Sequence, residues 1–211
     1  MLELIKVYKT LRYNSKERWL SYWYQINELL SINPESILVI GKGSGIVENA
    51  ISIIAADINI TTLDMAPEVC PDIVGDMQYM PFRESCFDSI LCCQVLEHLP
   101  FSKVRGVLIE LQRISRGSVI VSIPHRRKHL KLAIDAPLIG KRTIILKYPF
   151  MRKINRANTD SKSHFWEINR GVSYKSVKKT LNEFFVIEKT FLNEMNCTHR
   201  FFILRSKRSR L

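Results

Sequence analysis

The chain has 211 residues, 46% of them hydrophobic, and a formal net charge of +12. This length suits one α/β domain, which can bury about 70% of its unfolded surface, so we expect a single domain over residues 1–211. The sequence has no apolar run of 18 residues and no signal-peptide core near its start, so it predicts neither a transmembrane helix nor secretion. Five cysteines without paired spacing indicate reduced thiols and a cytoplasmic protein.

The charge is divided unevenly along the chain. Residues 1–125 carry 11 Lys and Arg against 14 Asp and Glu, whereas residues 126–211 carry 21 against 6. A basic half of this kind favours an anionic partner, such as a phosphate-bearing substrate, a nucleic acid or a membrane surface. The alternative is a solvated basic face that only keeps the protein soluble.

Two helices are predicted before the first strand. Apolar residues recur at helical spacing over residues 2–11, and a second helix is expected over residues 17–30. The second helix is rich in aromatic side chains, namely Trp19, Tyr22, Trp23 and Tyr24.

A strand of four apolar residues, 37–40, runs into a turn with glycines at alternate positions, Gly41, Gly43 and Gly45. Glycine lets the backbone turn tightly and lets a ligand lie against bare main chain, so this pattern indicates a site for a nucleotide-like ligand. A helix over residues 48–55 follows, and its N-terminus can hold a carboxylate. An ordinary turn between a strand and a helix is the alternative interpretation.

Three more strands follow at short intervals. The second, residues 58–63, ends at Asp64, 19 residues after Gly45, where a doubly wound fold places the acid that binds ribose hydroxyls. Position 46 is Ile, so the last glycine of the dinucleotide fingerprint Gly-x-Gly-x-x-Gly is missing, which disfavours a nicotinamide cofactor. The third strand, residues 72–75, and the fourth, residues 87–92, are each followed closely by a polar side chain, Asp76 and Gln94.

Four motifs in this stretch carry a family resemblance: GKGSG, LDMAPE, GDMQYMPF and FDSILCCQVLEHL. Their order between Ile37 and Leu99 resembles that of the class I S-adenosylmethionine-dependent methyltransferases, and the nearest branch is the group of small enzymes called methyltransferase type 11. The resemblance implies an α/β Rossmann-like fold with helices on both faces of a seven-stranded sheet. It also implies the strand order 3-2-1-4-5-7-6 with the last strand antiparallel, and S-adenosylmethionine as the cofactor.

The resemblance further implies the residues of the cofactor site. It places Asp76 on the adenine amino group and the backbone of Met77 on a ring nitrogen. The apolar side chains of Met65 and Met77 are expected to sandwich the purine, and filling of the core is the alternative. The expected cofactor-binding residues are Gly41, Gly43, Gly45, Asp64, Met65, Asp76, Met77 and Gln94. The sequence departs from the family at Val39, where relatives have Glu or Asp that helps to hold the loop and the methionine amino group. No zinc pattern is present, and no metal site is predicted.

Residues 1–30 are expected to form lid helices over the cofactor cleft, as a similar N-terminal helix does in type 11 relatives. Plain packing of residues 22–25 is the alternative. Residues 126–170 follow the fifth strand, where many class I enzymes insert a substrate cap, and we expect a cap with a β-hairpin centred on Gly140 and Lys141. The mixture of apolar and basic residues in this cap suits anionic lipid head groups.

The remaining elements complete the predicted sheet. A helix over residues 100–115, ended by Gly117 and Ser118, leads to a fifth strand over residues 119–123. A helix over residues 174–182, with Ser173 as its N-cap, precedes the last two strands. These strands are expected over residues 184–190 and 200–204, and a basic tail over residues 205–211 is expected to be disordered.

Methyl transfer from a sulfonium is an in-line displacement, so the protein mainly has to position the reacting atoms, which can supply about 7–11 kcal/mol. An acceptor oxygen of high pKa also needs a general base, typically worth ~10²–10⁴-fold. The candidates for this base follow the fourth and fifth strands or lie at the end of the cap; they are His98, His125, His164 and Glu167. We expect His129 and His199 to be peripheral.

The cap leads us to expect a methyltransferase for a small anionic acceptor, or for one linked to a lipid or a glycan. Such an enzyme is expected in the cytoplasm, with peripheral binding at the inner face of an anionic membrane. A nucleic-acid methyltransferase is the first alternative, favoured only by the basic half. The second alternative is a partner subunit that binds S-adenosylmethionine without catalysis, favoured only by Val39.

Overall fold

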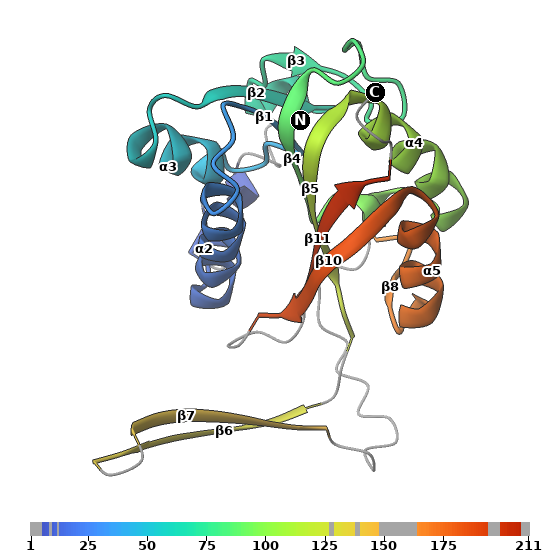
Figure 1. The fold of residues 1–211 in the computed structure, drawn as a ribbon. Coiled ribbons are helices and arrows are strands. Elements are labelled where there is room, and N and C mark those ends of the chain that lie inside the picture. The colour runs from blue at the N-terminus through green and yellow to red at the C-terminus, as the bar shows by residue number, and fades with distance from the viewer. Residues whose placement is uncertain are drawn as a thin grey trace.

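The structure is a computed structural model that describes residues 6–8, 10–11, 13–126, 129–137, 140–147, 164–193 and 199–207. Its centre is a seven-stranded sheet in the order β10-β11-β5-β4-β1-β2-β3 (Figure 1). The strands of this sheet are β1 (Ser36–Ile40), β2 (Asn59–Asp64), β3 (Ile73–Val74), β4 (Phe87–Cys93), β5 (Ser115–Pro124), β10 (Phe185–Leu192) and β11 (His199–Ser206).

The pairing of the strands confirms the predicted fold class. The first five strands run parallel to their neighbours, whereas β11 lies antiparallel between β5 and β10. Counted along the chain, this is the order 3-2-1-4-5-7-6 with an antiparallel last strand. Strand β1 lies at the centre and is buried over Ile37–Ile40, as expected for a parallel strand that is covered on both faces.

Helices cover both faces of the sheet (Figure 1). They are α2 (Lys16–Leu30), α3 (Ile46–Ile54), α4 (Val104–Ile114) and α5 (Tyr174–Phe184), with short 3-10 helices η1 (Pro67–Val69), η2 (Leu96–His98) and η3 (Phe101–Lys103). Apolar side chains of α2 and α3, such as Leu29 and Ile51, belong to one core cluster. Those of α4 and α5, such as Leu111 and Leu181, belong to the other. None of the helices that the described residues form is long and apolar enough to cross a membrane.

The N-cap predicted at Ser173 is confirmed, since its hydroxyl accepts a hydrogen bond from the Ser176 amide at 3.0 Å. Ser15 caps α2 in the same way, accepting from the Arg18 amide. Residues 6–8 are helical, but most of the helix predicted over residues 2–11 lies outside the described residues.

Two predicted boundaries were wrong. Helix α4 ends at Ile114 and β5 begins directly at Ser115, so Gly117 does not end a helix. A Cβ at Gly117 would lie 2.6 Å from the Asp88 carbonyl oxygen, and the glycine therefore permits close approach of β5 to β4. The predicted disordered tail also begins too early, because β11 pairs Arg205 with Val186 and Ser206 with Phe185. Residues 208–211 lie outside the described residues.

The predicted hairpin is present as β6 (His129–Ala136) and β7 (Gly140–Lys147), paired from His129 with Lys147 to Ala136 with Gly140. It lies apart from the seven-stranded sheet, below it in the view of Figure 1. The last part of the predicted cap belongs instead to the main body. Short strands β8 (Glu167–Ile168) and β9 (Gly171–Val172) follow Trp166, which is buried in the core beside α4 and α5.

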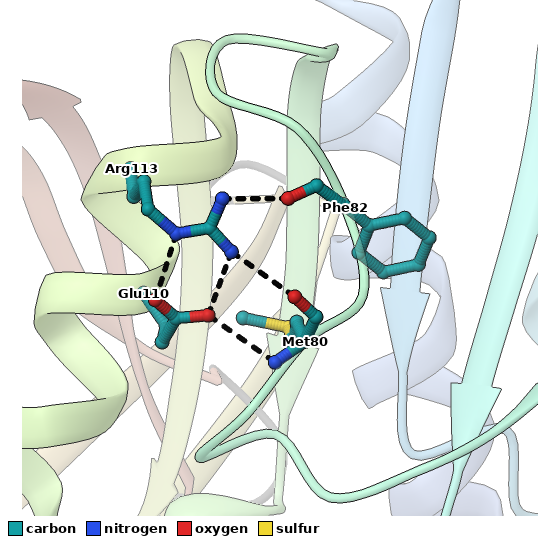
Figure 2. Close-up of polar contacts among 4 residues, drawn as sticks. All are labelled: Met80, Phe82, Glu110 and Arg113. Carbon is teal, nitrogen blue, oxygen red and sulfur yellow. Dashed lines mark hydrogen bonds and ion pairs between the residues drawn. The ribbon is translucent and has the colours of Figure 1, made fainter.

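A polar network anchors the loop after β3 to helix α4 (Figure 2). The Arg113 guanidinium donates to the carbonyl oxygens of Phe82 at 2.6 Å and Met80 at 3.0 Å, and to both carboxylate oxygens of Glu110 at 2.8 Å. The Glu110 carboxylate in turn accepts from the Met80 amide at 3.2 Å. The network fixes the loop that carries Asp76 and Met77, two of the predicted cofactor residues.

We expect Arg113→Ala to lower the free energy of unfolding by about 2–4 kcal/mol, because several partly buried hydrogen bonds to a charged group are lost together. The matched control is Arg116→Ala. Arg116 makes an exposed ion pair with Asp88 at 3.4 Å, which is worth about 0–1 kcal/mol. Urea unfolding of both variants measures the difference, and equal losses would show that the network does not hold the loop.

Candidate functional site

A cavity of about 1180 Å³ lies at the carboxyl ends of the parallel strands. Its lining includes Gly41 after β1, Asp64 at the end of β2, Gln94 after β4 and His125 after β5. Helix α2 contributes from the opposite side, through Tyr22 and its neighbours. This is the position at which open α/β sheets bind ligands.

The glycine turn presents bare backbone to this cavity. Gly41, Gly43 and Gly45 have φ angles of +79°, +55° and +78°, in the left-handed region that glycine adopts without strain. A Cβ at Gly41 would lie 2.6 Å from a methyl carbon of Val95, whereas one at Gly43 would have no atom closer than 3.9 Å. Gly43 therefore leaves room for a ligand against the main chain. Gly45 lines a smaller neighbouring hollow instead.

Asp64 lies beside the glycine turn and holds it through a hydrogen bond. One carboxylate oxygen accepts from the Gly43 amide at 3.3 Å and the other from the Ala66 amide at 2.9 Å. The residue lines the cavity, and each oxygen keeps a further lone pair. Asp64 can therefore accept hydrogen bonds from a ligand's hydroxyl groups while it orders the glycine turn.

The other residues predicted to surround the adenine are only partly together. Met77 is buried and Met65 is largely exposed, and both line the cavity. Asp76 is not among the lining residues; its carboxylate accepts from the amide and the side chain of Gln78, at 2.9 Å and 2.8 Å. Contacts of these side chains with adenine stay a prediction.

Gln94 ties helix α2 to the end of β4. Its side-chain oxygen accepts from Arg18 at 3.0 Å and its amide nitrogen donates to the Ser21 hydroxyl at 3.1 Å. Closer to the glycine turn, the hydroxyls of Tyr22 and Ser44 lie 3.3 Å apart. Helix α2 is thus held along one wall of the cavity, and the role of Gln94 is to position this helix.

Helical periodicity divides residues 22–25 between two environments. Tyr22 and Gln25 are buried and line the cavity, whereas Tyr24 packs on the rings of Phe191 and Phe201. Part of this stretch therefore borders the predicted cofactor site and part packs against the sheet.

The far end of the cavity brings together two segments that are distant in sequence. The Phe165 amide donates to the Glu97 carbonyl at 2.9 Å, and the indole N–H of Trp166 donates to the Leu99 carbonyl at 2.9 Å. These bonds place His164 beside His98, with ring centroids 4.9 Å apart.

His164 has the geometry of an oriented imidazole. Its Nδ1 lies 3.1 Å from a Glu167 carboxylate oxygen, which also accepts from Arg170 at 3.1 Å. The other Glu167 oxygen lies 3.6 Å from Arg126. Glu167 is thus surrounded by partners and positions His164. No hydrogen bond to His164 Nε2 occurs within the described part of the chain.

His125 has a different environment. Its Nδ1 accepts from Arg200 at 3.1 Å, and its Nε2 lies 2.9 Å from the side-chain nitrogen of Asn169. The ring also stacks on Tyr174. Both nitrogens are engaged, and this predicted base candidate is held as a buried structural group.

Two buried acidic residues of the cavity, Glu97 and Glu48, were not predicted as site residues. Glu97 is fully buried, both of its carboxylate oxygens are without a hydrogen-bond partner among the described residues, and burial raises its pKa to about 8. Glu48 is also buried without a partner in the described part of the chain, and burial raises its pKa. Glu97 lies in the motif FDSILCCQVLEHL, next to the predicted base candidate His98.

The expectation that His199 is peripheral was wrong. It lines the cavity because β11 runs antiparallel to β5 and pairs His199 with Pro124, at the carboxyl edge of the sheet. Burial lowers its pKa to about 4, helped by the charges of Arg18 and His164. The predicted antiparallel last strand was the signal that could have placed this residue. The side chain of His129 lies outside the described residues.

The cavity therefore has two chemically different ends. At one end, the bare backbone of the glycine turn and the Asp64 carboxylate suit contacts with a nucleoside and its ribose hydroxyls. At the other end, imidazoles and carboxylates suit proton transfer or the binding of a polar acceptor. The role of residues 126–170 as a substrate cap stays a prediction.

Known proteins were compared with this chain in sequence and in fold. Residues 38–122 match the family model described as "Methyltransferase domain". A similar fold is seen in an S-adenosylmethionine-dependent methyltransferase from Clostridium acetobutylicum, with a TM-score of 0.60, 11% identity and coverage of 95% of this chain and 96% of that one. No curated protein matches the sequence.

Two further structures are complexes. The 1,6-didemethyltoxoflavin-N1-methyltransferase of Burkholderia thailandensis, with 1,6-didemethyltoxoflavin and S-adenosylhomocysteine bound, has a TM-score of 0.60 and 13% identity, covering 98% of this chain and 87% of that one. The N-methyltransferase NodS of Bradyrhizobium japonicum, with S-adenosylhomocysteine bound, has a TM-score of 0.56 and 12% identity, covering 88% and 87%.

At these identities the solved structures show a shared fold, and the family match shows a methyltransferase domain over residues 38–122. Together these findings support an S-adenosylmethionine-dependent methyltransferase with S-adenosylmethionine as its cofactor. The open space at Gly43 and the carboxylate of Asp64 fit this cofactor.

Proposed function

We propose that this enzyme methylates a small anionic acceptor, or one linked to a lipid or a glycan. One observation carries the proposal: a single cavity joins the glycine turn and Asp64 to the His98, His164 and Glu167 cluster. A cofactor site and an acceptor site in one cavity are what methyl transfer requires, because the reacting atoms must lie on one line.

The chain's own residues divide the work between the two ends. Gly41, Gly43 and Asp64 would hold the cofactor, which when bound supplies a methyl group activated by a positively charged sulfur. Tyr22 and Gln25 of α2 shield that end from water. At the other end, Glu167 orients His164 beside the space for the acceptor.

Positive charge at the acceptor end supports an anionic acceptor. Arg126 lines the cavity, its side chain is 56% exposed, and it lies beside Glu167 at the rim. Arg18 lines the same cavity. Structural neighbours named for small-molecule acceptors, toxoflavin and magnesium protoporphyrin methyltransferases, support acceptors of that size. The basic hairpin sequence supports a lipid- or glycan-linked acceptor at the inner face of the cytoplasmic membrane.

The test is transfer of a labelled methyl group from S-adenosylmethionine to lipid, glycan and RNA fractions of cells. Label in a lipid or glycan fraction is the expected result. Label in RNA alone would favour the nucleic-acid alternative, and its binding should then weaken steeply with salt, by a slope of about −0.7 to −0.9 per contacted phosphate. Binding of S-adenosylhomocysteine without transfer to any fraction would favour a non-catalytic subunit.

A further inference from the structure

Three metal-ligating side chains meet at the acceptor end of the cavity. The carboxylate of Glu97 and the imidazoles of His98 and His164 each offer one ligand atom, and these atoms lie within 4.8 Å of one another. Ligands that bind an ion at about 2.0–2.2 Å lie roughly 3–4 Å apart. Because His98 is exposed, a small rotation of its side chain can close the remaining gap.

The state of Glu97 is an independent indication of a cation. Glu97 is 0% exposed, it lines the cavity, and neither carboxylate oxygen has a hydrogen-bond partner among the described residues. A buried carboxyl group without a partner is costly. A bound cation would supply the missing partner for both oxygens.

The orientation of His164 fits the same role. Glu167 accepts from Nδ1 at 3.1 Å, which leaves the lone pair on Nε2 for a ligand. Metal-bound histidines almost always donate their other ring N–H to a carboxylate, carbonyl or water in this way. The Glu97 backbone is tied to the same segment through the Phe165 amide at 2.9 Å, so the two segments are held in place before any ion binds.

We propose that Glu97, His98 and His164 bind one divalent transition-metal ion that coordinates an oxygen atom of the acceptor. Two imidazoles and one carboxylate form a donor set used for zinc and for iron(II), and three protein ligands leave positions open for a substrate. A hydroxyl group coordinated there would lose its proton to water more readily. The ion, and not a free histidine, would then activate the acceptor; this part rests on the proposed function, whereas the binding of the ion does not.

Calorimetric titration of Co²⁺ and Zn²⁺ into the chelator-stripped full chain, without cofactor or acceptor, tests the site. We expect one ion per chain, and a ligand-field absorption spectrum for Co²⁺. Glu97→Gln and His164→Asn should each weaken the affinity at least about 100-fold, and Glu167→Gln, which removes the partner that orients His164, by about 10–100-fold. Glu48→Gln is the matched control, because Glu48 is also a buried carboxylate of this cavity without a partner among the described residues; its affinity should stay within about twofold of the wild type.

Wild-type protein that binds neither Co²⁺ nor Zn²⁺ would refute the metal site. Equal losses of metal affinity in Glu97→Gln and Glu48→Gln would also refute it. Circular dichroism and S-adenosylhomocysteine binding check that each variant is folded, and His164→Asn decides the question where Glu97→Gln does not fold. A chain that binds S-adenosylhomocysteine but no ion refutes the metal site alone. A chain that binds the ion but transfers no methyl label refutes the proposed function alone.

Discussion

Replacing His164 by asparagine is expected to lower kcat for methyl transfer by about 10²–10⁴-fold, the usual contribution of a group that activates an acceptor. The affinity for S-adenosylhomocysteine should change less than about twofold, because the glycine turn and Asp64 form a separate end of the cavity. Steady-state kinetics with the acceptor found by label transfer, together with calorimetry, measures both quantities. The expected reduction in kcat follows from the position of His164, which Glu167 orients at 3.1 Å.

The matched control for this prediction is His125→Asn. His125 lines the same cavity, but its ring nitrogens are engaged by Arg200 and Asn169. We expect a lower midpoint of thermal unfolding and a change in kcat below about tenfold, since a buried hydrogen-bonded group is lost rather than an acceptor contact. A similar loss of kcat in both variants would contradict the distinction between the two histidines.

Replacing Asp64 by alanine is expected to weaken S-adenosylhomocysteine binding roughly 10- to 150-fold. This range corresponds to the loss of charge-assisted hydrogen bonds worth about 1.5–3 kcal/mol. The Gly43 amide also loses its acceptor at 3.3 Å, so the glycine turn is less ordered before the ligand binds. Calorimetric titration of wild type and variant measures the change, and Asp64→Asn should lose less because one oxygen acceptor remains.

Asp72→Ala serves as the control on the same edge of the sheet. The Asp72 carboxylate accepts from the hydroxyl and the amide of Thr62, at 2.6 Å and 2.8 Å, and Asp72 does not line the cavity. Its replacement should affect stability and leave the affinity within about twofold. Equal affinity of wild type and Asp64→Ala would show that Asp64 does not hold the cofactor. Tighter binding of NADH than of S-adenosylmethionine would contradict the family assignment.

The sequence signals that predict the cofactor end of the cavity are local. Gly41 and Gly43 need a backbone conformation that the residue type itself permits, and Asp64 follows a strand at a fixed distance. The N-cap at Ser173 is a signal of the same kind, since a hydroxyl three residues before an amide satisfies it without help from the rest of the chain. The sheet order was implied by the family resemblance that the four motifs carry.

The acceptor end was decided by the tertiary structure. His98, His125 and His164 were all base candidates in the sequence. Only partners 44 and 75 residues away from His125 show that its nitrogens are engaged. Glu97 becomes a candidate site residue because the fold buries it at the cavity without a hydrogen-bond partner among the described residues. His199 enters the cavity because the last strand inserts antiparallel beside β5. The period of the hydrophobic residues and the spacing of motifs determine local conformation. Burial and hydrogen-bond partners depend on contacts between distant segments, and these contacts determine the chemistry of each side chain.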